Sequence, residues 1–315
     1  MKKAVCIVIT LALILCTVSG CGFKTEEKLK IGLAAPAATH GWVAGVAYYA
    51  EKYCKENGID YKLTVAADAE DMKRNIDELL DWGMQALVLW PQWSGMEDYA
   101  DRVTRKGVPV VSFDVDVAGE RVCKVTGNNY DMGYQSAAYI AKTVGEGASI
   151  AVLEVPSAGS VSELRVQGFY DYFSDAGYDT SGIFKVSEEG FSRDCGYEDM
   201  KAILKEHKKV DAVFSLDDET SIGVVKAVTE SGRTDVKAIT GGGGMQEYLR
   251  MIADKQYASL GLMTALYSPM MIEDAIDVAM DLGRGQSAER MVVIPTKVVG
   301  AAEAAAYLDS GNTVY

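Results

Sequence analysis

The chain has 315 residues, of which 49% are hydrophobic and 24% are charged, and its formal net charge is −14. This acidity argues against nucleic acid or an anionic membrane surface as a partner. The length is enough for two ordinary domains after a short amino-terminal leader. Six cysteines are scattered along the chain without the spacing of a metal site or of a disulfide framework.

The amino-terminal segment predicts a lipoprotein signal peptide over residues 1–20. Two lysines precede an apolar run, Ala4–Val18, that is shorter than a membrane-spanning helix. The small residues before Cys21 resemble the lipobox of bacterial lipoproteins, whose cysteine becomes lipid-modified. We therefore expect a lipid anchor at Cys21 and a polar tether over 21–28. The alternative is a soluble secreted protein that is cut nearby and keeps Cys21 as a free thiol.

The first strand–helix unit carries the first candidate site residues. Leu29–Ala35 is typical of a buried strand, and apolar residues recur at helical spacing from Val43 onward. In an open α/β sheet, ligands bind beyond the carboxyl ends of the strands, where Trp42 and His40 would lie. Trp42 either packs between helix and sheet or offers a flat face to a ligand. His40 either bonds a ligand hydroxyl or faces solvent.

Strands and helices then alternate twice over. The first series has expected strands at 61–66, 84–90, 110–113 and 122–126, and helices at 70–82 and about 95–105. The second has strands at 149–154, 183–186, 210–215, 236–239, about 258–263 and 291–299, and helices at 132–144, 162–175, 195–206, 219–230 and about 269–281. Such alternation with short connections predicts parallel sheets. The predicted fold is α/β, with two similar doubly wound parallel-sheet lobes and a ligand cleft between them.

Several short blocks also follow one another in a characteristic order and spacing. They are Lys30-Ile-Gly-Leu33, Met84–Pro91, Gly107–Asp114, Thr126–Gly133, Arg165–Phe169, Val210–Glu219 and Ala238–Gly242. In these blocks the chain resembles the type I periplasmic sugar-binding proteins, the ribose-binding-like solute receptors of ABC importers.

The resemblance implies two lobes joined by three crossovers, which close on a ligand. One lobe would hold 29–126 plus 265–293, and the other 127–264 plus 294–315. The hinge would lie near Thr126, Thr264 and Ile294.

The ligand-contacting positions of the family carry over unevenly. Matching residues are Trp42, Asp114, Arg165 and Phe191, while Asp217 stands where ribose binders often have asparagine. Thr264 falls near a late glutamine of ribose binders. The sequence departs from the pattern at Val43, Val115 and Gly243, where ribose binders carry an aromatic, a basic and an acidic residue. Ribose itself is therefore in doubt.

These residue types suit a polyhydroxylated ligand. Carboxylates accept from hydroxyls, arginine donates several hydrogen bonds in a plane, and aromatic faces cover C–H surfaces. Other readings stay open at single positions: Asp217 could instead cap a helix, and Asn129 could serve a turn rather than the cleft. Of the tryptophans flanking Pro91, one is expected to pack and Trp93 to line the cleft.

Four functions are compatible with this pattern to different degrees. We expect a receptor that captures a monosaccharide or sugar alcohol for an ABC permease, as a monomer, without cofactor or bound metal. A receptor that presents its ligand to a membrane sensor kinase is the alternative. A secreted enzyme is disfavoured because no Gly-x-Ser-x-Gly or His-Glu-x-x-His motif is present. A sugar-responsive repressor is excluded by the lipobox and by the lack of a helix-turn-helix before Lys30.

Overall fold

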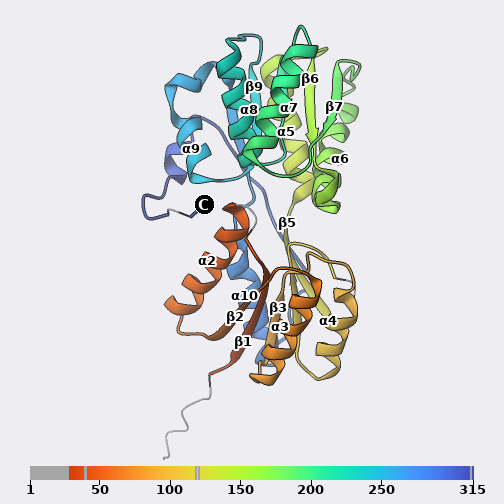
Figure 1. Cartoon of the computed structure of the whole chain (residues 1–315), viewed down its shortest axis with the longest axis vertical. Coiled ribbons are helices and arrows are strands. Elements are labelled where there is room, and N and C mark those ends of the chain that lie inside the picture. The colour runs from red at the N-terminus through yellow and green to blue at the C-terminus, as the bar shows by residue number, and fades with distance from the viewer. Residues whose placement is uncertain (1–27, 39–40, 118, 120, 313) are drawn as a thin grey trace, which may run out of the picture.

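The computed structural model describes residues 28–38, 41–117, 119, 121–312 and 314–315. They form two lobes, each built on a six-stranded sheet with helices on both faces (Figure 1). The predicted two-lobed α/β fold is confirmed. Within the described part of the chain, no helix is long and apolar enough to cross a membrane.

The amino-terminal lobe has the strand order β11-β5-β4-β3-β1-β2, with every pair parallel. Its strands are β1 (Lys30–Pro36), β2 (Asp60–Ala66), β3 (Ala86–Leu89), β4 (Val110–Phe113), β5 (Val122–Gly127) and β11 (Met291–Ile294). Helices α2 (Gly41–Glu56) and α10 (Met271–Gly283) share one apolar cluster with the sheet. Helices α3 (Ala69–Asp81) and α4 (Met96–Arg105) share another on the opposite face. Burial on both faces explains why strands such as Ala86–Leu89 are apolar throughout.

The carboxy-terminal lobe repeats the plan with the order β12-β10-β9-β8-β6-β7. Its strands are β6 (Ile150–Glu154), β7 (Ile183–Ser187), β8 (Ala212–Phe214), β9 (Ala238–Gly243), β10 (Leu262–Leu266) and β12 (Val298–Val299), of which only β12 runs antiparallel to its neighbour. Helices α5 (Asn129–Val144) and α6 (Ser160–Asp175) cover one face, and α7 (Arg193–Glu206), α8 (Asp218–Ser231) and α9 (Gln246–Ala253) the other. Short 3₁₀ turns occur at Pro156–Ala158, Lys255–Leu260 and Ala304–Tyr307.

The chain passes between the lobes at three places. β5 belongs to the first sheet, and α5 directly after it packs in the second lobe. β10 belongs to the second sheet, whereas α10 packs on the first. β11 and β12 lie in different sheets although only a few residues separate them. The expected strand over 291–299 is therefore two short strands rather than one.

Two further details differ from the sequence prediction. The expected strand over 258–263 begins only at Leu262, because Lys255–Leu260 forms a 3₁₀ turn. The expected strand over 236–239 extends further, because Gly241–Gly243 continue β9 and pair with Thr264, Ala265 and Leu266. A Cβ at Gly241 would lie 2.4 Å from Asp218 Oδ1, so the side chains of the neighbouring helix occupy the space that glycine leaves.

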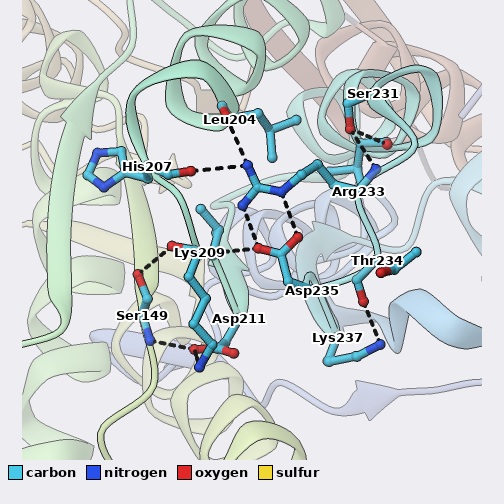
Figure 2. Close-up of polar contacts among 12 residues, drawn as sticks. Ser149, Leu204, His207, Lys209, Asp211, Ser231, Arg233, Thr234, Asp235 and Lys237 are labelled. Atoms are coloured by element: carbon cyan, nitrogen blue, oxygen red, sulfur yellow. Dashed lines mark hydrogen bonds and ion pairs between the residues drawn. The ribbon is translucent and has the colours of Figure 1, made fainter.

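Charged side chains gather where the strands of the carboxy-terminal lobe begin (Figure 2). This end of the sheet points away from the other lobe (Figure 1). Arg233 pairs with Asp235 through Nε and Nη2, and its Nη1 donates to the carbonyls of Leu204 and His207 at the end of α7. The Asp235 carboxylate also accepts from the Val210 backbone amide at 2.8 Å. A cation at the carboxyl end of a helix satisfies carbonyls that have no partner within the helix.

The three cysteines among the described residues are not in disulfides. Cys54 and Cys123 are buried in the first lobe, and Cys195 in the first turn of α7 is partly exposed. Burial raises the pKa of the Cys54 thiol to about 12 and raises that of Cys123 as well.

Candidate ligand-binding site

A cavity of about 500 Å³ lies between the lobes, at the carboxyl ends of their strands. The first lobe contributes two tryptophan rings beside polar and aliphatic groups, and the second contributes mainly small and polar residues together with one phenylalanine ring. The wall of the first lobe contains Trp42, Trp90, Gln92, Asp114 and Val115. The second lobe contributes the 157–161 turn, Arg165, Gly190, Phe191, Asp217, Gly242 and Gly243, and Tyr267 and Tyr315 complete the wall.

Trp42 is fixed in the wall by both stacking and a hydrogen bond. Its ring lies 6.2 Å from Phe113, with 9° between the planes, and stands edge-on to Trp90 at 5.3 Å. Its indole nitrogen donates to the Tyr267 carbonyl at 2.6 Å. Trp42 therefore packs and also lines the cavity, so the two readings of this residue hold together.

Trp90 presents a donor without a partner. Trp90 is 2% exposed, and its buried indole nitrogen makes no hydrogen bond of full geometry with any described residue, although its approach to the Asp114 carboxylate lowers the pKa of that acid. A buried donor that lacks a partner carries a free-energy penalty of about 1–3 kcal/mol. An oxygen atom in the cavity would remove that penalty.

Asp114 places a carboxylate directly after β4. Its backbone φ of 62° lies in the left-handed region, which non-glycine residues adopt at a cost of about 1 kcal/mol per residue. The Tyr267 hydroxyl donates to Asp114 Oδ1. Burial raises the pKa of Asp114, and the Tyr267 hydrogen bond and the Arg165 charge oppose that rise.

Arg165 brings a positive charge from α6 to the same cavity. Its Nε donates to Asn129 Oδ1 at 2.9 Å and its Nη1 to the Leu216 carbonyl at 2.8 Å. The guanidinium carbon lies 4.9 Å from the centre of the Tyr267 ring. These two hydrogen bonds use two of five N–H groups. The others remain for oxygens in the cavity.

Asp217 is both a helix cap and part of the cavity wall. Its carboxylate accepts from the backbone amides of Thr220 and Glu219 at the start of α8. Asp217 also lines the cavity, so helix capping and a place in the wall hold together at this residue. Phe191 lies across the cavity from the tryptophans, on the wall formed by the second lobe.

Asp218, one residue further on, supports this wall from behind. It is fully buried and accepts from Thr264 Oγ1 and from the amides of Gly244 and Met245, each at 2.7 Å. Burial raises its pKa to about 7 although all three donors lower it. The loop after β9 is therefore tied to α8 by one carboxylate.

Several predicted site residues lie elsewhere. Trp93 packs beneath α3 and α4, and Trp90 takes the position in the cavity wall that was expected for it. Thr264 is not on the wall but holds Asp218. Asn129 stands behind the wall, where it bonds Arg165 and the Tyr267 hydroxyl. His40 and Cys21 lie outside the described residues.

Sequence reasoning missed Tyr267, Tyr315, Gln92 and the 157–161 turn as parts of the wall. Trp90 could have been found, because it ends a buried strand whose carboxyl end faces the cleft. Tyr267 accepts the Trp42 hydrogen bond although 225 residues separate the two in the chain, and no local sequence pattern predicts that contact.

Comparisons with known proteins agree with this architecture. Residues 31–287 match the family profile described as "Periplasmic binding protein domain". The ribose import binding protein of Bacillus subtilis is 29% identical over 313 residues, covering 95% of this chain and 99% of that protein.

Solved structures share the fold. An ABC transporter periplasmic solute-binding protein from Actinobacillus succinogenes with bound D-allose superposes with a TM-score of 0.80 at 19% identity, covering 89% of this chain and all of the other. The fructose-binding periplasmic domain of the hybrid two-component system BT1754 gives 0.75 at 20% identity, covering 88% of this chain and 92% of that domain.

Proposed function

The chain belongs to the periplasmic binding protein domain family, and on that premise we propose that it captures a monosaccharide or sugar alcohol between its lobes and delivers it to an ABC permease. Among its matched relatives are the ribose import binding protein of Bacillus subtilis and an ABC transporter periplasmic solute-binding protein with bound D-allose, which are solute-binding proteins and not enzymes. The observation that carries the proposal is the composition of the cavity wall, which combines aromatic rings from both lobes with carboxylate, guanidinium and amide groups.

The ring wall suits the weakly apolar faces of a sugar. Trp42 is locked by Phe113 and Tyr267, so little side-chain entropy remains to be lost when a ligand packs on it. The unsatisfied Trp90 donor lies in the same wall and gains an acceptor when a hydroxyl arrives. Stacking and donation from one surface match a molecule that has C–H faces and hydroxyl edges.

The charges of the wall favour a neutral ligand. Asp114 and Arg165 are both buried, and each lowers the free energy of the other's charged form, with Tyr267 in contact with both. A charged ligand would disturb this balance, and a buried unpaired charge is costly. Hydroxyls can accept from Arg165 and donate to Asp114 without adding charge.

The choice between sugar and sugar alcohol rests on the departures from ribose binders. Gly243 offers no acidic side chain and Val115 no basic one. Because the groups that would bond ribose at these positions are missing, we infer that a polyol or another small uncharged sugar fits better than ribose.

Binding by the purified protein tests the proposal directly. D-ribose, D-allose, D-fructose, myo-inositol and glycerol should be compared by thermal shift and titration calorimetry, together with mass spectrometry of any ligand retained during purification. At least one should raise the melting temperature, because a ligand that binds only the folded state stabilises it. If no member of this panel stabilises the protein and no sugar or polyol is retained, the proposed ligand class is wrong.

We further propose that Cys21 carries a lipid anchor, that residues 21–28 form a tether and that the receptor acts as a monomer. Cys21→Ser should release the protein from the cell membrane into the medium, and light scattering should give the monomer mass. If the chain is instead cut nearby as a secreted protein and Cys21 stays a free thiol, wild type and Cys21→Ser should both be soluble.

A second candidate function keeps the ligand but changes the partner to a membrane sensor kinase. It is favoured by the similarity in fold to the periplasmic domain of a hybrid two-component system. Sugar-dependent stimulation of ATP hydrolysis by the reconstituted permease would support import. Stimulation of a kinase without any effect on the permease would support signalling.

A further inference from the structure

Tyr315 enters the cavity from a segment that follows the last strand. The chain leaves β12, packs its 3₁₀ turn Ala304–Tyr307 beside α9, and then runs to the space between the lobes near the start of α2 (Figure 1). Gln246 of α9 holds this segment from one lobe, because its side chain bonds the Asp309 amide and the Tyr307 carbonyl. The segment therefore starts on the carboxy-terminal lobe.

The other end of the segment is held by the amino-terminal lobe. Asn312 is 6% exposed, and its Nδ2 donates to the Tyr49 hydroxyl of α2 at 2.6 Å. Its Oδ1 accepts from the amides of Val314 and Tyr315, each at 3.0 Å. One buried side chain thus fixes the turn that aims Tyr315 at the cleft.

Three glycines make room for the Tyr315 side chain. Cβ atoms built at Gly41 and Gly45 of α2 would lie 3.4 Å and 3.0 Å from Tyr315 carbons, and one at Gly243 of β9 would lie 1.9 Å from its hydroxyl oxygen. Glycine inside a helix costs about 1 kcal/mol relative to alanine. At Gly45 that cost is explained by the contact, since Tyr315 and Pro269 both press against the site.

The hydroxyl of Tyr315 is a donor without a partner among the described residues. Tyr315 is 5% exposed and lines the cavity. Among the described residues, its one hydrogen bond is the one that its backbone amide donates to Asn312 Oδ1. Burial and the nearby Asp218 and Asp217 carboxylates raise its pKa well above the ordinary value, so the hydroxyl keeps its proton.

We propose that Tyr315 is a specificity-determining ligand contact, whose ring limits the size of the bound sugar or polyol and whose hydroxyl bonds one of its oxygens. The hydroxyl stands beside Gly243, at the position where ribose binders carry an acidic side chain. At this position the neutral phenol of Tyr315, which comes from a distant segment of the chain, takes the place of the carboxylate of ribose binders. This inference rests on the proposed function, because it concerns the same ligand.

The test uses Tyr315→Phe and Tyr315→Ala, with Tyr307→Phe and Tyr307→Ala as matched controls. Tyr307 lies in the same segment but outside the cavity, where Lys297 covers its ring. D-ribose, D-allose, myo-inositol and glycerol are titrated against each variant, and circular dichroism checks folding. Tyr315→Phe removes only the hydroxyl, so it decides the hydrogen bond even if Tyr315→Ala fails to fold.

Tyr315→Phe should weaken the tightest probe about tenfold, as the loss of one buried hydrogen bond does. Tyr315→Ala should change the affinity ratio of six-carbon to smaller probes at least tenfold in favour of the larger ones, and the Tyr307 variants should bind as wild type. If the wild-type protein binds a probe and neither Tyr315 variant changes that affinity by more than twofold, this inference is wrong and the proposed function stands. Absence of wild-type binding to every probe overturns the proposed function and this inference with it.

Discussion

The two ends of the carboxy-terminal sheet each hold an aspartate, and the surroundings of these two carboxylates shift their pKa values in opposite directions. At the end where the strands begin, Asp235 is paired with Arg233, and that partly exposed pair holds the pKa of Asp235 well below its usual range (Figure 2). At the end where they finish, Asp218 is fully buried, accepts three neutral hydrogen bonds, and has a pKa raised to about 7.

The difference lies in what surrounds each carboxylate. Both accept from backbone amides, but only Asp235 touches a cation and keeps contact with water. Desolvation penalises the charged form of a buried acid, and neutral donors recover only part of that penalty. The Arg233–Asp235 pair therefore stabilises the fold. The buried Asp218 carboxylate carries a desolvation cost, and it is kept at the other end of the sheet because it holds the cavity wall in place. Four predictions test this contrast.

The largest effect is expected for Asp218→Ala. The substitution leaves three buried donors without an acceptor and opens a small cavity, so unfolding should require about 4 kcal/mol less free energy. Urea denaturation at pH 8 measures it. Asp218→Asn keeps the shape and one acceptor oxygen, and should lose much less. Equal losses in both variants would mean that the hydrogen bonds contribute little.

The second prediction concerns pH. The folded-state pKa of Asp218, about 7, exceeds the unfolded value of about 3.9, so the folded state binds more protons between these values. Its contribution to stability is full below about pH 4 and is lost as the pH rises through 7, with a slope of at most about 1.4 kcal/mol per unit.

Comparison with Asp218→Asn isolates this slope. Asp114 and Glu188 also have raised pKa values, that of Glu188 being about 8, but they are present in both proteins. The difference between the two stability curves from pH 4 to 7 should therefore amount to about 2 to 3 kcal/mol. Parallel curves would show that Asp218 does not take up a proton in this range.

The third prediction sharpens the picture of the ring wall. Trp42→Ala and Trp90→Ala should each weaken the best ligand of the panel by about 2 kcal/mol, roughly 30-fold, because each removes a face or a donor from the cavity. Trp93→Ala is the control, since that ring packs beneath α3 and α4. Calorimetry on folded variants decides, and a Trp93 effect as large as that of Trp90 would restore the sequence-based expectation.

The smallest change in stability is expected for Arg233, at the end of the carboxy-terminal sheet where the strands begin. Arg233→Ala should lower the free energy of unfolding by about 1 kcal/mol, through loss of the Asp235 pair and of two carbonyl contacts at the end of α7. Ligand affinity should not change. Lys237→Ala is a matched control, because that exposed lysine donates only to the Thr234 carbonyl. A loss of ligand affinity in Arg233→Ala would contradict the separation of the two ends.

The sequence predicted what local patterns and strand ends determine. Alternating strands and helices were enough for the fold. Trp42, Asp114 and Asp217 line the cavity, but Asp114 and Asp217 were named through the family resemblance, and ligand contact by all three stays a prediction. Trp90 and Trp93 were exchanged because the chain turns at Pro91 and sequence spacing does not say which ring points back to the sheet.

The rest of the site depends on contacts between distant segments. Tyr267 comes with a crossover between the lobes, and Tyr315 with a segment anchored by Gln246 and Asn312. Thr264 was placed in the cleft by alignment, but its hydroxyl turns to Asp218 because that buried carboxylate needs a donor. Such choices follow from packing between lobes, which no local pattern encodes.

The unequal exposure of the three cysteines makes one position chemically addressable. Thiol reagents attack the thiolate, which burial suppresses at Cys54 and Cys123, whereas Cys195 is partly exposed. Cys195 lies four residues after Phe191, which lines the cavity. In a protein that starts at Lys28, an environment-sensitive fluorophore coupled to a thiol would thus attach at Cys195, close in sequence to the cavity wall. Its emission would report on the proposed ligand binding without any added cysteine.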